Sequence, residues 1–385
     1  MPNVLIMGGR APAALDHARR FSQQGWAAYI ADSVPCRLSG WSSAVKASIQ
    51  LAAPSQHPQA FIDDLNRTIA RYQIDLLMPT CEEVFFLSRY RKYLPASVRV
   101  LVDDFDKLRT LHSKWHFLKL AEQYGGNPPL SRLVSSVNEA RAWAGNTPLV
   151  LKPEYSRFGV HVRLYPQGMP HNLAPLGQQG AWVAQHFKPG RELCSYSVAD
   201  QGRLLAHVVY EPKHRLGKSS SFYFAPYDAP LIREFVAKLV AAINYTGQIS
   251  FDWIESQGGI PSVIECNPRA VSGVHLFGMQ DALPAALAGQ LDDCVQPSAA
   301  TPRMLAAIML SAGLIQSMRE REFRAWWADY KAAGEVIGVA QDRLPLLGAL
   351  ADMSSFALMA WQQKCSMREA ATRDIEWDGQ ELAEP

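Results

Sequence analysis

Apolar runs of strand length alternate with amphipathic segments along the first hundred residues. The runs are residues 4–7, 26–31, 75–79 and 98–102, and the clearest amphipathic segments are residues 13–24 and 61–72. Short apolar runs are typical of buried strands, and apolar residues spaced three and four apart are typical of helices. Because strands that alternate with helices form βαβ units, this pattern predicts a Rossmann-like parallel sheet.

The pattern changes near residue 105, where a turn and a helix over residues 108–124 lead out of the first sheet. Predicted strands follow at residues 149–152, 161–164, 182–186, 193–200, 204–210, 248–253 and 262–266, with a long helix at 229–244. Short strands joined by hairpin turns such as Asp200-Gln201-Gly202 indicate an α+β fold with antiparallel pairs.

From about residue 285 the pattern is mainly helical, and residues 319–333 are the clearest segment. Two apolar stretches, residues 304–315 and 346–361, are too short to cross a membrane, and we expect both to be buried helices. The last dozen residues are acidic, and we expect them to fray. We therefore expect three parts, over residues 1–105, 106–290 and 291–385.

Composition and charge narrow the class of protein. Of the 385 residues, 48% are apolar and 19% are charged, and the formal net charge is only +2. So small a charge gives no reason to expect a nucleic acid or a membrane as a partner. The six cysteines lack the spacing of a zinc site or a disulfide framework, and the N-terminus lacks the features of a signal peptide. We therefore expect a cytoplasmic protein with reduced thiols.

The loop after the first strand contains Gly8 and Gly9 and has two readings. It is placed like a dinucleotide-binding loop, but it lacks the G-x-G-x-x-G spacing. A structural turn is the simpler account, and a nicotinamide-dependent dehydrogenase is correspondingly a poor option.

The most informative stretch is residues 247–273. Two predicted strands, joined by a Gly-Gly turn, carry Asp252 on one and Glu265 on the other, followed by Asn267 and Arg269. Positions 265, 267 and 269 share one face of an extended strand, and a hairpin partner can bring Asp252 beside them. Carboxylate and amide oxygens suit Mg²⁺, and a nearby arginine can hold a phosphoryl or carboxylate group.

These residues, with Leu151-Lys152-Pro153 upstream, resemble the ATP-grasp superfamily over about residues 1–290. The closest types are the carboxylate–amine ligases and the carbamoyl-phosphate-synthetase-like ATP-binding domain. The resemblance implies a Rossmann-like pre-ATP-grasp domain, then a two-lobed ATP-grasp domain whose small lobe spans about residues 110–190, then a helical region. ATP would lie between the lobes with Mg²⁺, or Mn²⁺ as an alternative, held by Asp252, Glu265 and Asn267.

The resemblance also assigns residues to the nucleotide. Lys114 and Lys152 would reach the phosphates, and the loop that contains Ser156 and Gly159 would cover them. The main chain of Gln185, His186 and Phe187 would contact adenine, and Glu192 would bind the ribose, although Gln185 stands where the family usually has glutamate. Arg269, Lys152 and Arg215 would act on the reacting groups.

Several other residues have more than one possible role. Residues 211–222 form a basic stretch that closes over ATP or over the substrate, or is simply a solvated loop. Glu82 or Glu83, after a strand of the first sheet, would meet a substrate or serve a helix N-terminus. His275 would face the substrate or be buried packing.

The resemblance implies an ATP-dependent carboxylate–amine ligase that forms an acyl phosphate and releases ADP and phosphate. Its substrates would be a small-molecule carboxylate and an amine, neither of which the sequence identifies. A carboxylase-type enzyme and a non-catalytic ATP-binding sensor are the alternatives. Many members of the superfamily are dimers, so a homodimer is compatible with the sequence.

Overall fold

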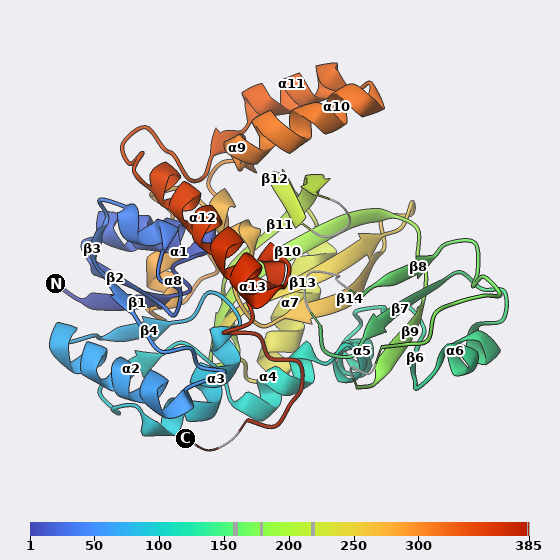
Figure 1. Ribbon diagram of the computed structural model, residues 1–385, viewed down its shortest axis with the longest axis horizontal. Helices are drawn as coiled ribbons and strands as arrows, with labels where there is room; N and C mark the ends of the chain where they lie inside the picture. Colours follow the sequence, from blue (N-terminus) through green and yellow to red (C-terminus); the bar gives the residue numbers. More distant parts are fainter. Residues whose placement is uncertain (157–160, 178–179, 217–219, 383, 385) are drawn as a thin grey trace.

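The computed structural model describes residues 1–385 except 157–160, 178–179, 217–219, 383 and 385. The described residues form three β-sheets, with helices packed between and around them. Figure 1 shows the parallel sheet in blue on the left, the largest sheet in the middle and the smallest sheet in green on the right. The mixed α/β and α+β architecture predicted from the sequence is confirmed.

The N-terminal sheet is parallel and has the strand order β3-β2-β1-β4-β5. Its strands are β1 (Asn3–Met7), β2 (Ala27–Asp32), β3 (Val45–Gln50), β4 (Leu76–Met78) and β5 (Arg99–Val100). Its helices are α1 (Pro12–Gln23), η1 (Leu38–Trp41), α2 (Pro58–Tyr72), α3 (Glu83–Tyr90) and η2 (Arg91–Tyr93). Strand β3 escaped prediction because it is an edge strand in which partly buried and exposed residues alternate.

The predicted helix over residues 108–124 is two helices, α4 (Phe105–His112) and α5 (Lys114–Gln123). The extended conformation of Ser113 separates them, and its side chain accepts a hydrogen bond from His116 N–H to cap α5. A four-stranded antiparallel sheet follows, in the order β6-β9-β7-β8. Its elements are β6 (Ser131–Val134), α6 (Val137–Ala144), β7 (Leu149–Pro153), β8 (Arg163–Tyr165) and β9 (Trp182–His186).

The largest sheet has seven strands in the order β14-β13-β10-β11-β12-β15-β16. Its central elements are β10 (Arg191–Asp200), β11 (Arg203–Leu216), β12 (Ser220–Tyr227), α7 (Pro230–Ala242), β13 (Gly247–Glu255), β14 (Pro261–Asn267), η3 (Ser272–Leu276) and α8 (Leu283–Leu287). Two short strands from beyond residue 290, β15 (Arg303–Met304) and β16 (Gly334–Glu335), extend the same sheet. The three-part division of the chain stays a prediction.

The remaining elements are helical. They are α9 (Ala306–Ile308), η4 (Met309–Gly313), α10 (Leu314–Glu320), α11 (Phe323–Ala332), α12 (Pro345–Gln363) and α13 (Met367–Ala370). The helix predicted at residues 319–333 is interrupted at Arg321, whose φ of 64° lies in the left-handed region. None of the helices in the described ranges is long and apolar enough to span a membrane.

The expectation that both C-terminal apolar stretches are buried helices is wrong. Residues 304–315 begin at the end of strand β15 and expose Leu310 and Ile315, and α12 is exposed along one side. This helix packs against η1 through one side, where Gly348 approaches Trp41 and Asp352 accepts a hydrogen bond from Leu38 N–H. Its other side exposes large apolar side chains: Leu346, Leu347, Leu350, Met353, Leu358 and Trp361. The one charged residue of α12, Asp352, lies on the buried side, so the exposed side is an apolar face without charge.

The expectation that the last dozen residues fray is also wrong for the segment around Trp377. Trp377 is only 1% exposed and packs against Phe85, Phe105, His112 and Tyr155. We call residues 371–380 the C-terminal strap, because they run across the carboxyl edge of the parallel sheet and reach Tyr155 near the green sheet (Figure 1).

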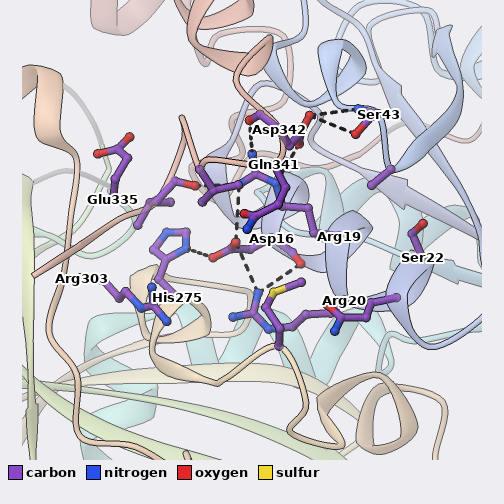
Figure 2. Close-up of a pocket in the computed structure, with 15 residues that line it drawn as sticks. Asp16, Arg19, Arg20, Ser22, Ser43, His275, Arg303, Glu335, Gln341 and Asp342 are labelled. Carbon is purple, nitrogen blue, oxygen red and sulfur yellow. Dashed lines mark hydrogen bonds and ion pairs between the residues drawn. The ribbon is translucent and has the colours of Figure 1, made fainter.

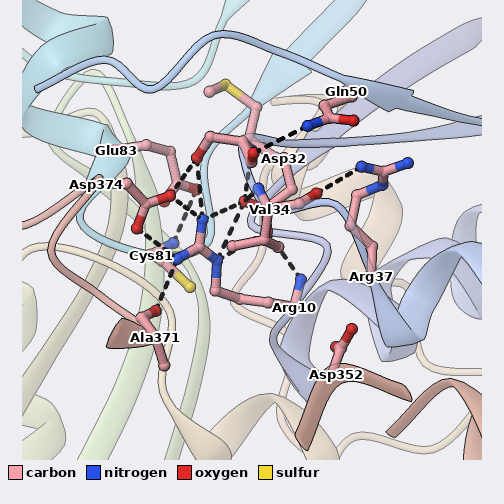
Figure 3. A network of polar contacts seen from close by, with 12 residues as sticks. Arg10, Asp32, Val34, Arg37, Gln50, Cys81, Glu83, Asp352, Ala371 and Asp374 are labelled. Carbon is pink, nitrogen blue, oxygen red and sulfur yellow. Dashed lines mark hydrogen bonds and ion pairs between the residues drawn. The ribbon is translucent and has the colours of Figure 1, made fainter. Parts of the chain in front are cut away.

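The Gly8-Gly9 loop is a structural turn. Gly8 has a φ of +76°, and a Cβ there would lie 2.4 Å from Thr80 Oγ1. The next residue, Arg10, donates hydrogen bonds to Asp32 at the end of β2 and to Asp374 and the Ala371 carbonyl of the strap (Figure 3). The strap therefore occupies the edge of the sheet where a dinucleotide would need to bind.

Candidate functional site

The hairpin of β13 and β14 brings the predicted metal ligands together. Asp252 lies directly opposite Glu265 in the register, and Ser250 lies opposite Asn267. Asn267 Nδ2 is 3.4 Å from Asp252 Oδ2, and Arg269 Nη2 is 3.4 Å from Asn267 Oδ1. The period-two spacing thus places the four side chains side by side, as the sequence predicted.

Asp252 and Glu265 repel each other when both are ionised. Burial, followed by repulsion from Glu265, raises the pKa of Asp252 to about 6, while the Cys194 thiol donates a hydrogen bond to Asp252 Oδ1 over 3.1 Å. A divalent cation between the carboxylates would relieve this repulsion, so the donors fit Mg²⁺. Within the described ranges, no cluster of three or more His, Cys, Asp or Glu side chains forms a ready metal site. The rest of the coordination would come from Asn267, water and phosphate oxygens.

Two buried lysines from other elements approach strand β14. Lys152, near the end of β7, donates to the Ile264 carbonyl over 3.0 Å, and Lys114, at the start of α5, has its Nζ 3.7 Å from Glu265 Oε1. Both are at least 96% buried. Burial, with repulsion from Lys114, lowers the pKa of Lys152 to about 8, although Glu265 and Asp252 oppose this shift. Two cations and two carboxylates therefore face one another where β7 and α5 meet the β13–β14 hairpin.

A cavity of about 370 Å³ opens beside these groups. Its walls come from β10 to β14 and η3, and they include six of the residues predicted from the sequence: Glu192, Arg215, Asp252, Glu265, Asn267 and Arg269. A space of this size, with charged groups converging on one side, is typical of a small-molecule site.

The basic stretch over residues 211–222 belongs, in its described part, to two paired strands and not to a loop. Strand β11 extends to Leu216 and pairs with β12, and Lys218 lies outside the described residues. Arg215 consequently has a fixed place on β11, where it forms an ion pair with Glu192. The Nε2 of His214 is 2.8 Å from Asp329 of α11, which ties the hairpin to the C-terminal helices. The sequence missed this hairpin because its serines and lysines have low strand propensity.

The residues predicted for adenine lie apart from this cavity. Gln185 is 3% exposed in β9 and donates to Ser131, and His186 packs against Trp143. The main-chain N–H groups of His186 and Phe187 donate to Leu130 and Pro148. These two N–H groups thus have partners within the protein, and the adenine assignment, which concerns main-chain groups of all three residues, stays a prediction. The Ser156 carbonyl accepts a hydrogen bond from Lys114, and Gly159 lies outside the described residues.

The parallel sheet contributes to the site through residues after β4. Glu82 is 1% exposed, and its Oε1 is 3.7 Å from Arg269 Nε. Glu83 accepts hydrogen bonds from the N–H groups of Thr80 and Cys81, as its structural reading predicts. His275 is buried and hydrogen-bonds Asp16, so the packing reading of this residue is the better one.

Sequence reasoning missed Cys194, which lines the cavity and contacts Asp252. It stands two residues after Glu192, so strand periodicity alone could have placed it on the same face. Its position opposite Asp252 depends on the pairing of β10 with β13, which no local pattern reveals.

Comparisons with known proteins agree with this architecture. No protein-family model matches the chain. The multifunctional protein URA2 of Saccharomyces cerevisiae is 24% identical over 193 residues, which cover 45% of this chain and 8% of that protein. The chain thus matches only a small part of that relative's length.

Solved structures resemble far more of the chain. N5-carboxyaminoimidazole synthetase from Staphylococcus aureus has a TM-score of 0.62 at 15% identity, with 83% of this chain and 85% of that chain covered. L-amino acid ligase from Bacillus licheniformis has a TM-score of 0.56 at 16% identity, with 76% of each chain covered. The biotin carboxylase domain of Hydrogenobacter thermophilus 2-oxoglutarate carboxylase has a TM-score of 0.59 at 12% identity, with 76% and 71% covered.

Identities this low establish the fold alone. The resemblance inferred from the sequence is confirmed at the level of the fold, which the chain shares with N5-carboxyaminoimidazole synthetase and L-amino acid ligase.

Proposed function

We propose that the chain is an ATP-dependent ligase that activates a small-molecule carboxylate as an acyl phosphate and joins it to an amine. The observation that carries this proposal is the convergence of Lys114 of α5 and Lys152 of β7 with Asp252 and Glu265 of the β13–β14 hairpin. The S. aureus enzyme has also been solved with ADP, and the H. thermophilus domain with MgADP, which supports nucleotide binding by a chain of this fold.

Each residue would act on charge rather than as a nucleophile. Bound Mg²⁺ would neutralise the phosphates, held by Asp252, Glu265 and Asn267. Lys114 and Lys152 would bind phosphate oxygens in a site from which water is excluded, because both lysines are buried.

The reaction would proceed in two transfers. A carboxylate oxygen, held by Arg269, attacks the γ-phosphorus of ATP, and the bond to ADP breaks. The amine then attacks the carbonyl carbon, loses a proton, and phosphate leaves with the activating oxygen. Glu82, 3.7 Å from Arg269, is placed to hold that arginine toward the substrate and to receive the amine.

Glu192 and Arg215 form an ion pair at the cavity wall. We infer that nucleotide binding opens this pair, so that Glu192 meets the ribose and Arg215 meets a phosphoryl oxygen. A partner exchange of this kind costs little, because both side chains are partly exposed.

The two alternatives differ in what they require. A carboxylase-type enzyme is favoured by the biotin carboxylase neighbour and would consume ATP only with bicarbonate. A sensor would bind ATP without releasing ADP, but buried like-charged carboxylates with no role in binding metal would be costly to keep.

The test is ADP release from ATP and Mg²⁺ with pools of amino acids and small carboxylic acids, with and without bicarbonate. Glu265→Gln should remove the activity, whereas Glu234→Gln, at an exposed position on α7, should leave it unchanged. Release that needs an acid and an amine supports the ligase, and bicarbonate dependence supports the carboxylase. Tight ATP binding without release under any condition would contradict both enzymes.

A further inference from the structure

A larger cavity, of about 600 Å³, lies away from the β13–β14 hairpin (Figure 2). It is enclosed by the second half of α1, the loop before β3, η3, the short strands β15 and β16, and the segment before α12. Cavities of this volume at the junction of several chain segments are typical of small-molecule sites.

The acidic side chains in this cavity all have partners. Asp16 is bonded to His275 and lies 3.4 Å from Arg20 Nη1. Burial alone would raise the pKa of Asp16, but Arg20 and His275 outweigh it and hold the pKa well below its usual range. Glu335 accepts hydrogen bonds from the N–H groups of Ala306, Ile337 and Gly338.

Asp342 is similarly engaged, since it accepts hydrogen bonds from Arg19 and from the side chain of Ser42. The other N–H groups of Arg19 donate to the carbonyls of Val336, Ile337 and Asp342. The acids of the cavity are therefore satisfied within the protein and are not available to bind a cation.

Two arginines, by contrast, keep unused donors. Among the described residues, the side chain of Arg303 has no hydrogen-bond or ion-pair partner, and its Nε is buried. The Nε of Arg20 is also buried without a partner, in a side chain that is 2% exposed. Gly334 leaves room for Arg303, because a Cβ there would lie 2.6 Å from its Nη1. Figure 2 shows Arg303 beside His275, with Asp16 between His275 and the arginines of α1.

Buried guanidinium donors without partners are costly, and an anion is the ligand that satisfies them. The cavity is far larger than one phosphate or carboxylate group, and its other polar side chains are neutral: Ser22, Gln23, Ser43 and Gln341. The ligand that fits would thus carry an anionic group on a larger, uncharged polar body.

This cavity is separate from the candidate nucleotide site. The two cavities share no lining residue. The rings of His275 and Phe224, 5.7 Å apart, stand between them, with His275 facing this cavity and Phe224 the other. Ser272, at the start of η3, lines the smaller cavity beside Asp252 and Glu265, and His275 of η3 lines the larger one, so this five-residue helix contributes to the walls of both cavities.

We propose that this cavity is a second ligand site, specific for a small metabolite with a phosphate or carboxylate group, which Arg303 and Arg20 bind. It does not depend on the proposed ligase activity, since it rests on residues outside the smaller cavity.

The binding test uses calorimetry with saturating MgADP, so that the nucleotide site is filled. Four probes separate the two anion sources: inorganic phosphate and ribose 5-phosphate, and glutamate and citrate. At least one probe should bind, and Arg303→Gln should weaken it by about tenfold, because a charge-assisted pair is lost. Gln341→Glu, at the exposed rim, should weaken it through repulsion, whereas Arg324→Gln on exposed α11 should not.

The location test uses crystals soaked in selenate, whose selenium gives an anomalous signal. A peak beside Arg303 that is absent in Arg303→Gln and present in Arg324→Gln is expected. The proposal is overturned if none of the four probes binds, if Arg303→Gln binds as tightly as the wild type, or if selenate lies elsewhere on the surface as an adventitious ion only.

Discussion

Replacing Trp377 with alanine should detach the C-terminal strap. The indole is 1% exposed and lies against Phe85 at 4.9 Å, Tyr155 at 5.2 Å and Phe105 at 5.3 Å between ring centroids. Removing a buried aromatic side chain costs about 3–5 kcal/mol. A loss of about 3 kcal/mol corresponds to roughly a hundredfold larger population of detached strap, if the rest of the fold stays intact.

Limited trypsin digestion at Arg373 measures this population, because the strap must open before the protease can cut there. Trp377→Ala should be cut about a hundredfold faster than the wild type. Trp361→Ala is the matched control, since Trp361 is 78% exposed on α12 and should change stability by less than about 0.5 kcal/mol. Equal cutting rates for wild type and Trp377→Ala would refute the view that this tryptophan fixes the strap.

Three further outcomes are expected. Lys152→Met should weaken ADP binding by at least about tenfold in a fluorescence titration, because it removes a buried positive charge from the phosphate site, and it should not lower the melting temperature. Unchanged affinity for ADP would contradict the assignment of Lys152 to the phosphates. Burial and the charge of Arg20 lower the pKa of His17 to about 3, so the unfolded chain binds a proton that the folded chain refuses. The contribution of His17 to the free energy of unfolding should therefore be fully present above about pH 6.5 and fall by up to about 1.4 kcal/mol per pH unit below it. Denaturant titration at pH 7 and pH 5 should show a smaller loss of stability in His17→Gln than in the wild type. Equal losses in the two proteins would count against this prediction. If a second copy of the chain covers the apolar face of α12, Leu350→Lys should be monomeric by light scattering. Leu231→Lys, at an exposed position of α7, should stay dimeric. A monomeric wild type would rule out the homodimer.

The cluster of proposed metal ligands on β13 and β14 was predictable from the sequence because it depends on residues close together in the chain. Asp252 and Glu265 belong to one hairpin with a Gly-Gly turn, and period-two alternation fixes the face that Glu265 and Asn267 share. Lys152 lies near the end of the short strand β7, whose apolar pattern also predicts a buried strand. The fold class followed from βαβ alternation over the first hundred residues.

The features that escaped prediction depend on contacts between distant residues. Trp377 is buried only because Phe85 and Tyr155 come from segments far away in the chain, and an acidic terminus gives no local sign of this. The pairing of Asp16 with His275 spans 259 positions. The exposed face of α12 looked like a core helix because apolar periodicity cannot tell burial in the same chain from exposure.

The measurement that tests the central claim most directly is the transfer of oxygen from the substrate acid to phosphate. Pools of acids with ¹⁸O-labelled carboxylates are incubated with amines, ATP and Mg²⁺, and the released phosphate is analysed by mass spectrometry. Activation as an acyl phosphate predicts phosphate that carries one ¹⁸O atom for each ADP formed, with both products lost in Glu265→Gln. Release of ADP with unlabelled phosphate would contradict the acyl-phosphate ligase.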